Sequence, residues 1–278
     1  MLDDSRFAVP TTVAGYVDVA AGKALKGPVD LKLDGSNNAG QITSRGGTMP
    51  IESGVFIHGS GAIRANELAN SGRIVADKGT LNIQAVDITN TGSLEATSGS
   101  TLWINGSGTF DSQGVISIVP GATVKVSTAG AVDNQGAITV GPGGTLNFAT
   151  ARTNNHGTIS ILSLAPSAVT TTTSFVAESG SHLVFATNPL RSGPALVVSG
   201  NLYLTAADDW LDLIPSGQPH TEPLISFTGS GSGSFDHVTP GFVVNYSGQT
   251  IWVTEIPEPT LMMAWSLSIL MGRGIRRR

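Results

Sequence analysis

The sequence contains no cysteine and few charged side chains, and nothing before residue 260 has the pattern of a long amphipathic helix. The lack of cysteine excludes disulfides, thiolate zinc sites and a cysteine nucleophile. Charged residues make up 13% of the chain and the formal net charge is −5. This charge balance argues against nucleic acid as a partner, because nucleic-acid interfaces are basic.

Glycine and β-forming residues are abundant instead. The chain of 278 residues has 35 glycines, and Thr, Ser, Asn, Val and Ile recur throughout. This composition is typical of an all-β chain with many turns. The length allows one large β domain.

The middle of the chain repeats with a period of about 21 residues. Five glycines mark the period, with spacings of 20, 22, 22 and 21 residues: Gly72, Gly92, Gly114, Gly136 and Gly157. Four of them close an Asn-x-Gly triplet, and the third follows Ser112 instead. Asn and Gly accept left-handed backbone angles, so we expect the chain to turn corners here.

Short runs of alternating apolar residues follow these corners. The first set comprises Ile74/Ala76, Leu94/Ala96, Ile116/Ile118, Ile138/Val140 and Ile159/Ile161. A second set follows Gly79, Gly99, Gly121 and Gly144, namely Leu81/Ile83, Leu102/Ile104, Val124/Val126 and Leu146/Phe148. Alternation of this kind predicts strands with one buried face.

A period of this length with two or three short strands fits one coil of a parallel β-helix. We therefore predict an all-β, right-handed parallel β-helix over residues 41–205. Its roughly eight coils, stacked about 4.8 Å apart, would form a rod about 40 Å long. A β-sandwich or a set of hairpins is the alternative, because its strands recur at a similar interval.

The repeat weakens at both ends of the chain. We predict an irregular segment over residues 1–40 and a β cap over residues 206–254. Within the cap, two apolar strands at residues 242–246 and 251–253 surround a turn at residues 247–250. A hairpin at this place would cover the open end of the solenoid, which otherwise exposes unpaired strand edges.

The last segment, residues 255–278, combines three features in a fixed order. Pro257, Glu258 and Pro259 predict an extended strip that a protease could read. An apolar run follows at residues 261–271, and the chain then ends in a basic group formed by Arg273, Arg276, Arg277 and Arg278. A helix over residues 260–275 would be roughly 24 Å long, shorter than the bilayer core of about 30 Å. Arginine side chains reach the headgroups, so we expect a short C-terminal transmembrane helix with the arginines on the cytoplasmic side and residues 1–259 outside.

At these residues the chain resembles the carboxy-terminal sorting signal of the PEP-CTERM family. Pro257, Glu258 and Pro259 match the signature tripeptide of that family, and residues 276–278 match its basic end. The departures are the short apolar run and Arg273 within its last turn. The resemblance implies export, a transient inner-membrane anchor and recognition by an exosortase, a membrane cysteine protease.

The segment from residue 223 to 254 also resembles, diffusely, the closing segment of secreted PEP-CTERM and autotransporter-like solenoids. An exported chain is expected to begin with a basic patch and an apolar region. Residues 1–7 have neither. We expect that the start is misassigned or truncated, and export by another route is the alternative.

Five carboxylates cluster late in the chain, namely Asp208, Asp209, Asp212, Glu222 and Asp236, and the stretch from Asp208 to Asp212 would be the candidate site if the chain were a carbohydrate-active enzyme. Glycosidases hold two carboxylates about 5–9.5 Å apart in a cleft. Asp208 and Asp209 are adjacent, so on a strand they would face opposite sides. We favour the interpretation that these acids are polar residues flanking an apolar cluster around Trp210.

Other reactive patterns are weak. The five histidines, His58, His156, His182, His220 and His237, do not pair at metal-ligand spacing, and we expect surface or turn positions for them. The glycine-rich run at residues 229–233 lacks the Lys-Ser/Thr of a phosphate loop and predicts a turn. Asp111 and Asp133 are expected to stack on one face of the rod, but the calcium-binding glycine-aspartate repeat is absent. We expect no cofactor and no metal.

The sequence therefore predicts a non-enzymatic exported protein, a structural or adhesive β-solenoid at the cell surface or in the extracellular matrix. Its expected partners are an exosortase-type membrane protease, the membrane and extracellular polysaccharide. The alternative is a carbohydrate-active or carbohydrate-binding β-helix protein.

Overall fold

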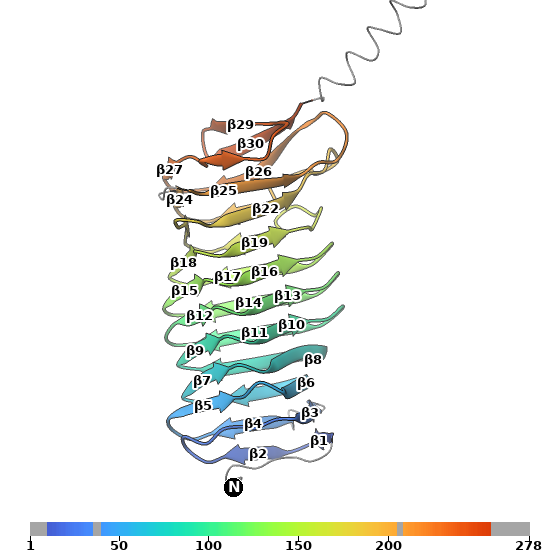
Figure 1. The fold of residues 1–278 in the computed structure, drawn as a ribbon, viewed down its shortest axis with the longest axis vertical. Helices are drawn as coiled ribbons and strands as arrows, with labels where there is room; N and C mark the ends of the chain where they lie inside the picture. Colours follow the sequence, from blue (N-terminus) through green and yellow to red (C-terminus); the bar gives the residue numbers. More distant parts are fainter. Residues whose placement is uncertain (1–9, 36–39, 205–207, 257–278) are drawn as a thin grey trace, which may run out of the picture.

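The computed structural model describes residues 10–35, 40–204 and 208–256. Every regular element within these ranges is a β-strand, and the strands wind into a solenoid whose axis is vertical in Figure 1. Strands one coil apart pair in parallel, which excludes the sandwich and hairpin alternatives for the repeat. The predicted parallel β-solenoid is confirmed.

Each coil contributes one strand to each of three faces. Face 1 comprises β1 (Thr11–Val13), β3 (Val29–Leu33), the first part of β6 (Val55–Arg64), the first part of β8 (Arg73–Ala85), β10 (Ser93–Ala96), β13 (Val115–Ile118), β16 (Ala137–Val140), β19 (Thr158–Ile161), β22 (His182–Ala186), β25 (Trp210–Ile214) and β28 (His237–Val238). Face 2 comprises β2 (Tyr16–Val19), β4 (Gln41–Ser44), the second parts of β6 and β8, β11 (Thr101–Gly106), β14 (Thr123–Thr128), β17 (Thr145–Ala149), β20 (Val169–Thr171), β23 (Leu196–Val198) and β26 (Thr221–Phe227).

Face 3 comprises β5 (Thr48–Ile51), β7 (Glu67–Asn70), β9 (Asp87–Asn90), β12 (Phe110–Ser112), β15 (Ala131–Asn134), β18 (Arg152–Asn155), β21 (Ser174–Ala177), β24 (Leu202–Leu204) and β27 (Gly231–Gly233). Faces 1 and 2 form one 21-stranded sheet because β6 and β8 run across the corner between them, and face 3 is a separate 9-stranded sheet. Strands β5 to β24 place eight coils within residues 41–205, as predicted.

The stacking extends beyond the predicted boundaries on both sides. Strand β1 pairs in parallel with β3, and β3 pairs with β6, so most of the segment predicted to be irregular already follows the coil geometry. At the other end β25 and β27 continue faces 1 and 3 past residue 206. The sequence pattern missed the first coils because the Asn-x-Gly corners begin only at Asn70.

The core is a column of inward-facing aliphatic and aromatic side chains. On face 1 the register stacks Ile74, Leu94, Ile116, Ile138 and Ile159 directly on one another, and all are buried. Faces 2 and 3 add further rows of buried side chains. The largest fully buried side chains of the core are Phe110, Phe148, Phe175 and Phe185. Burying one such side chain stabilises the fold by about 1.5–3 kcal/mol.

At the Asn-x-Gly corners, buried polar side chains of successive coils form hydrogen bonds with one another. The side chains of Asn70, Asn90, Ser112, Asn134 and Asn155 are buried in one row at the end of face 3. Within this row the amide of Asn70 donates to Oδ1 of Asn90 at 2.8 Å, and that of Asn134 donates to Oδ1 of Asn155 at 2.7 Å. The row therefore satisfies most of its own buried polar groups, and Oδ1 of Asn134 has no hydrogen-bond partner among the described residues.

The corner glycines are required for a reason other than the one predicted. A Cβ atom on Gly114 would lie 2.1 Å from the carbonyl oxygen of Gly92, and one on Gly136 would lie 2.0 Å from that of Gly114. Neither residue has the left-handed backbone angle that the sequence argument invoked. That angle occurs in the second set of glycines, at Gly99 and Gly121.

A β hairpin closes the C-terminal end, as predicted. Strands β29 (Phe242–Ser247) and β30 (Thr250–Glu255) pair in antiparallel fashion around Gly248, whose φ is +59°. Strand β30 also pairs antiparallel with β26, so the hairpin covers the last edge of face 2 (Figure 1). The predicted transmembrane helix falls at residues 260–275, outside the described residues. Among residues 10–35, 40–204 and 208–256, no helix is long and apolar enough to cross a membrane.

We expect Gly136→Ala to destabilise the solenoid by about 1–3 kcal/mol or more, because the added methyl group overlaps a backbone carbonyl that cannot move without shifting the neighbouring coil. Gly15→Ala is the matched control, since a Cβ atom there meets nothing within 4 Å. Urea unfolding followed by circular dichroism measures both. Equal stabilities of the two variants would contradict the close-approach argument.

Candidate functional site

The residues of the predicted sorting motif, Pro257, Glu258 and Pro259, lie outside the described residues, as do Arg273, Arg276, Arg277 and Arg278. Strand β30 ends at Glu255, and the exposed Ile256 is the last residue that the structure describes. The folded end of the solenoid therefore lies directly before the motif.

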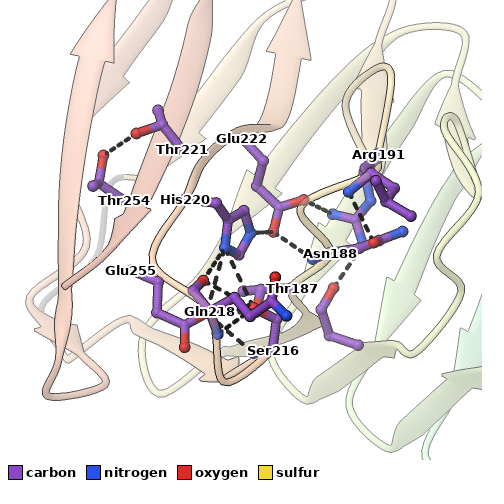
Figure 2. A network of polar contacts seen from close by, with 12 residues as sticks. Thr187, Asn188, Arg191, Ser216, Gln218, His220, Thr221, Glu222, Thr254 and Glu255 are labelled. Atoms are coloured by element: carbon purple, nitrogen blue, oxygen red, sulfur yellow. Dashed lines mark hydrogen bonds and ion pairs between the residues drawn. The ribbon is translucent and has the colours of Figure 1, made fainter. Parts of the chain in front are cut away.

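Glu255 belongs to a polar network that connects β30 to the corner loops of the last coils (Figure 2). It points inward along β30, in line with Ile251 and Val253. Its Oε2 accepts hydrogen bonds from the backbone N–H of Ser216 at 3.1 Å and from the Ser216 hydroxyl at 2.9 Å. Its Oε1 accepts one from the backbone N–H of Gly217 at 3.1 Å. The last residue of the cap is thus fastened to the turn that follows β25.

His220 lies between acceptors on both sides of its ring. Nδ1 is 2.7 Å from the carbonyl oxygen of Gln218 and 3.5 Å from Oε2 of Glu255. Nε2 is 3.3 Å from Oε1 of Glu222. Both ring nitrogens thus face oxygen atoms of neighbouring groups. His220 thereby joins Glu222 and Glu255 through one ring (Figure 2).

Arg191 and Glu222 form a buried ion pair beside this histidine. Nη1 of Arg191 is 3.1 Å from Oε2 of Glu222, and their side chains are 0% and 2% exposed. The contact has the distance of an ion pair but not the angle of a hydrogen bond. Nη2 of Arg191 instead donates to the carbonyl oxygens of Ala186 at 2.6 Å and Ser163 at 3.3 Å. Burial lowers the pKa of the Arg191 guanidinium, and the negative charge of Glu222 opposes that shift.

Ser216, His220 and Glu222 have the residue types of a catalytic triad but not its hydrogen bonds. The Ser216 hydroxyl is 3.3 Å from Nδ1 of His220, yet Nδ1 faces the Gln218 carbonyl at 2.7 Å and donates its proton there. The same hydroxyl lies closer to Glu255, at 2.9 Å. A triad needs a ring nitrogen that is free to accept the serine proton. The hydrogen bonds of this network instead fasten the cap to the corner loops.

The structure separates the five candidate acids into different environments. Asp209 is buried and accepts a hydrogen bond from the Ser181 hydroxyl at 3.2 Å, while Asp208 is exposed. The two neighbours differ in burial, but both precede β25 and neither lies on a strand. Asp236 accepts a hydrogen bond from the backbone N–H of Asp208 at 2.6 Å. Glu222 lies in the separate network around Arg191.

Asp212 and Asp208 each lie beside a histidine. Asp212 is 2.9 Å from Nδ1 of His182, and Asp208 is 2.7 Å from Nε2 of His237. Trp210 lies between these histidines, stacked on His237 with ring centroids 4.0 Å apart and on His182 at 5.4 Å. Both faces of the indole are covered, so no sugar ring can stack there.

Each of the two other histidines also lies beside a carboxylate from another coil. His58 is 3.2 Å from Asp30 and 2.7 Å from Asp77, and His156 is 3.3 Å from Asp133. Asp133 lies beside Asp111 in the register of face 3, as the sequence predicted. In the described part of the chain, no group of three or more His, Asp or Glu residues could hold a metal ion.

Sequence reasoning missed the network around Arg191, His220 and Glu255. A signal was present, because Glu255 continues the alternation of Ile251 and Val253 and thus occupies an inward position. A carboxylate at such a position predicts a buried cation or a cluster of donors. Its donors could not be foreseen, since they come from loops 30 to 70 residues away in an irregular part of the repeat.

Comparisons with known proteins found no relative of this chain. No family model matches it, and no curated protein or solved structure matches it.

We expect Arg191→Met to lower the free energy of unfolding by about 3–5 kcal/mol, because it leaves the buried Glu222 carboxylate without its charge partner. Arg73→Met, which breaks the exposed pair with Glu95, should cost at most about 1 kcal/mol. Chemical denaturation of both variants measures the difference. Similar losses in the two would contradict the assignment of Arg191 as the centre of the network.

Proposed function

We propose that this protein is exported and forms a structural or adhesive β-solenoid at the cell surface or in the extracellular matrix. The observation that carries the proposal is the position of the sorting-like tail. Glu255, the last residue of the folded cap, is held by buried hydrogen bonds, and the Pro257-Glu258-Pro259 motif begins two residues later. A protease would therefore meet an extended strip next to a firmly closed domain.

In this proposal an exosortase-type membrane protease recognises Pro257, Glu258 and Pro259. Residues 260–275 form a short transmembrane helix that anchors the chain transiently, and the terminal arginines stay on the cytoplasmic side. Cleavage then releases the rod to the cell surface or matrix. The solenoid winds in the right-handed sense, which parallel strands joined by crossovers almost always adopt.

A non-enzymatic role is supported by the arrangement of the acids. Asp208 and Asp212 lie against histidines, Glu222 is paired with Arg191, and Asp209 is buried against Ser181. This arrangement differs from two carboxylates facing each other across a cleft. Hydrolysis or elimination of a polysaccharide by the purified chain would contradict this part of the proposal.

The tail is tested by Pro257→Ala combined with Glu258→Ala in the native host. We expect the variant to stay in the membrane fraction at its unprocessed mass, because the strip that the protease reads is gone. Thr260→Ala, just beyond the motif, is the matched control and should be processed normally. Membrane fractionation and mass spectrometry measure both, and normal release of the double variant would refute the sorting assignment.

A second candidate function is carbohydrate binding without cleavage. It is favoured by an open groove on face 2, which is separate from the network at the C-terminal end.

A further inference from the structure

A groove of about 780 Å³ runs across the outer surface of face 2 near the N-terminal end of the solenoid. It crosses four successive strands, from β4 through β6 and β8 to β11, which lie one above another in Figure 1. These strands span three strand spacings, or about 14 Å. Side chains that line it include Ser60, Arg64, Thr80, Asn82 and Trp103.

The groove exists because a small residue interrupts a row of larger ones. In register along the outer side of face 2 lie Gln41, Ala62, Asn82, Trp103 and Lys125. Ala62 is buried at the bottom of this row. The chain also passes from face 1 to face 2 through Gly59 and Gly61 without a projecting loop, so β6 itself adds no wall beside Ala62.

Trp103 forms one wall of the groove. Its side chain is exposed, and its indole Nε1 donates to the Ser127 hydroxyl at 3.4 Å on the following coil. Trp210 has histidines stacked on both faces, whereas no aromatic ring in the described part of the chain stacks on Trp103. An exposed indole with a fixed polar edge offers an apolar surface to a flat ligand.

Arg64 supplies a positive charge at the edge of the groove, and Asp34, on the segment after β3, supplies a negative one. Its Nε donates to Oε1 of Gln84 at 2.8 Å, which orients the guanidinium. Arg73 and Arg152 each pair with a glutamate, but the terminal nitrogens of Arg64 contact no carboxylate among the described residues. A guanidinium fixed in this way presents two parallel N–H donors to a carboxylate.

Asn82 lies between Arg64 and Trp103 on the intervening strand. Its Oδ1 is shielded from solvent and has no hydrogen-bond partner among the described residues. Asn82 nevertheless lines the groove. The NH₂ group of a carboxamide is a hydrogen-bond donor to sugar hydroxyls.

We propose that this groove binds an acidic polysaccharide whose uronic-acid carboxylate pairs with Arg64. A sugar ring lies against Trp103, and sugar hydroxyls bond to Asn82 and Thr80. Arg64 and Trp103 lie two strands and two residues apart, roughly 12 Å between their Cα atoms, so the ligand must be an oligomer and not a single sugar. This inference deepens the carbohydrate-binding candidate above and does not depend on the sorting tail.

Binding of a defined oligogalacturonate to the full-length chain tests the proposal, with calorimetry and tryptophan fluorescence as readouts. We expect measurable binding that weakens about tenfold or more for the methyl-esterified oligomer, because esterification removes the carboxylate charge. A neutral cello-oligosaccharide of equal length should bind weakly or not at all.

Variants separate the contributions of the two side chains. Trp103→Ala should abolish binding, and Trp103→Phe should retain part of it because a ring remains. Arg64→Gln should bind the acid and its ester equally weakly. Trp252→Ala removes another exposed tryptophan, on the cap, and is the matched control, which should bind as well as the parent chain. Because all these side chains face outward, unchanged thermal unfolding verifies that each variant is folded.

Three results would overturn the proposal: no binding of any oligomer, binding that Trp103→Ala leaves unchanged, or equal affinity for acid and ester in the parent chain. Processing of the tail is measured separately. Loss of binding with normal processing would refute the groove alone, and failed processing with intact binding would refute the sorting assignment alone.

Discussion

The rest of the molecule depends on how closely successive coils approach at the Asn-x-Gly corners. The carbonyl oxygen of one corner glycine occupies the place that a Cβ atom would take on the next, at Gly92, Gly114, Gly136 and Gly157. Because that contact leaves almost no room for slippage, it fixes the position of each coil along and around the axis. A slip of one residue would turn every inward side chain of a strand outward.

The fixed register arranges side chains of one kind into rows along the axis. Aliphatic rows form the interior, the amide row of Asn70, Asn90, Asn134 and Asn155 fills one corner, and polar rows cover the outside. The contacts between histidines and carboxylates on the outer surface follow from the same geometry. Asp212 is in register with Val184, two residues from His182 along β22, so the side chains of Asp212 and His182 lie diagonally opposite on the same outer face. Each of these outer contacts therefore joins neighbouring coils and not two residues of one strand.

The regular part of this arrangement could be predicted from the sequence because each coil repeats the same local signal. The alternation at Ile116/Ile118 and Leu102/Ile104, and the turn before Thr250, specified strands and a hairpin that the structure contains. The physical role of the corner glycines could not be predicted, since close approach depends on a neighbour some 21 residues away. The same holds for Arg191, Glu222 and Glu255, which meet only because long corner loops stack where the period is lost.

The strands that carry the groove, β4 to β11, and the strand that precedes the tail, β30, lie toward opposite ends of the solenoid (Figure 1). Six strand spacings separate β11 from β30, or about 29 Å. The Debye length at physiological ionic strength is about 8 Å, so the field of an anionic lipid surface falls off over a much shorter distance. In the proposed anchored state, Arg64 would meet the proposed acidic polymer beyond the electrostatic reach of the bilayer. The rod would then act as a spacer between Arg64 and the membrane. Anionic lipid headgroups would therefore not compete with the acidic polymer for Arg64.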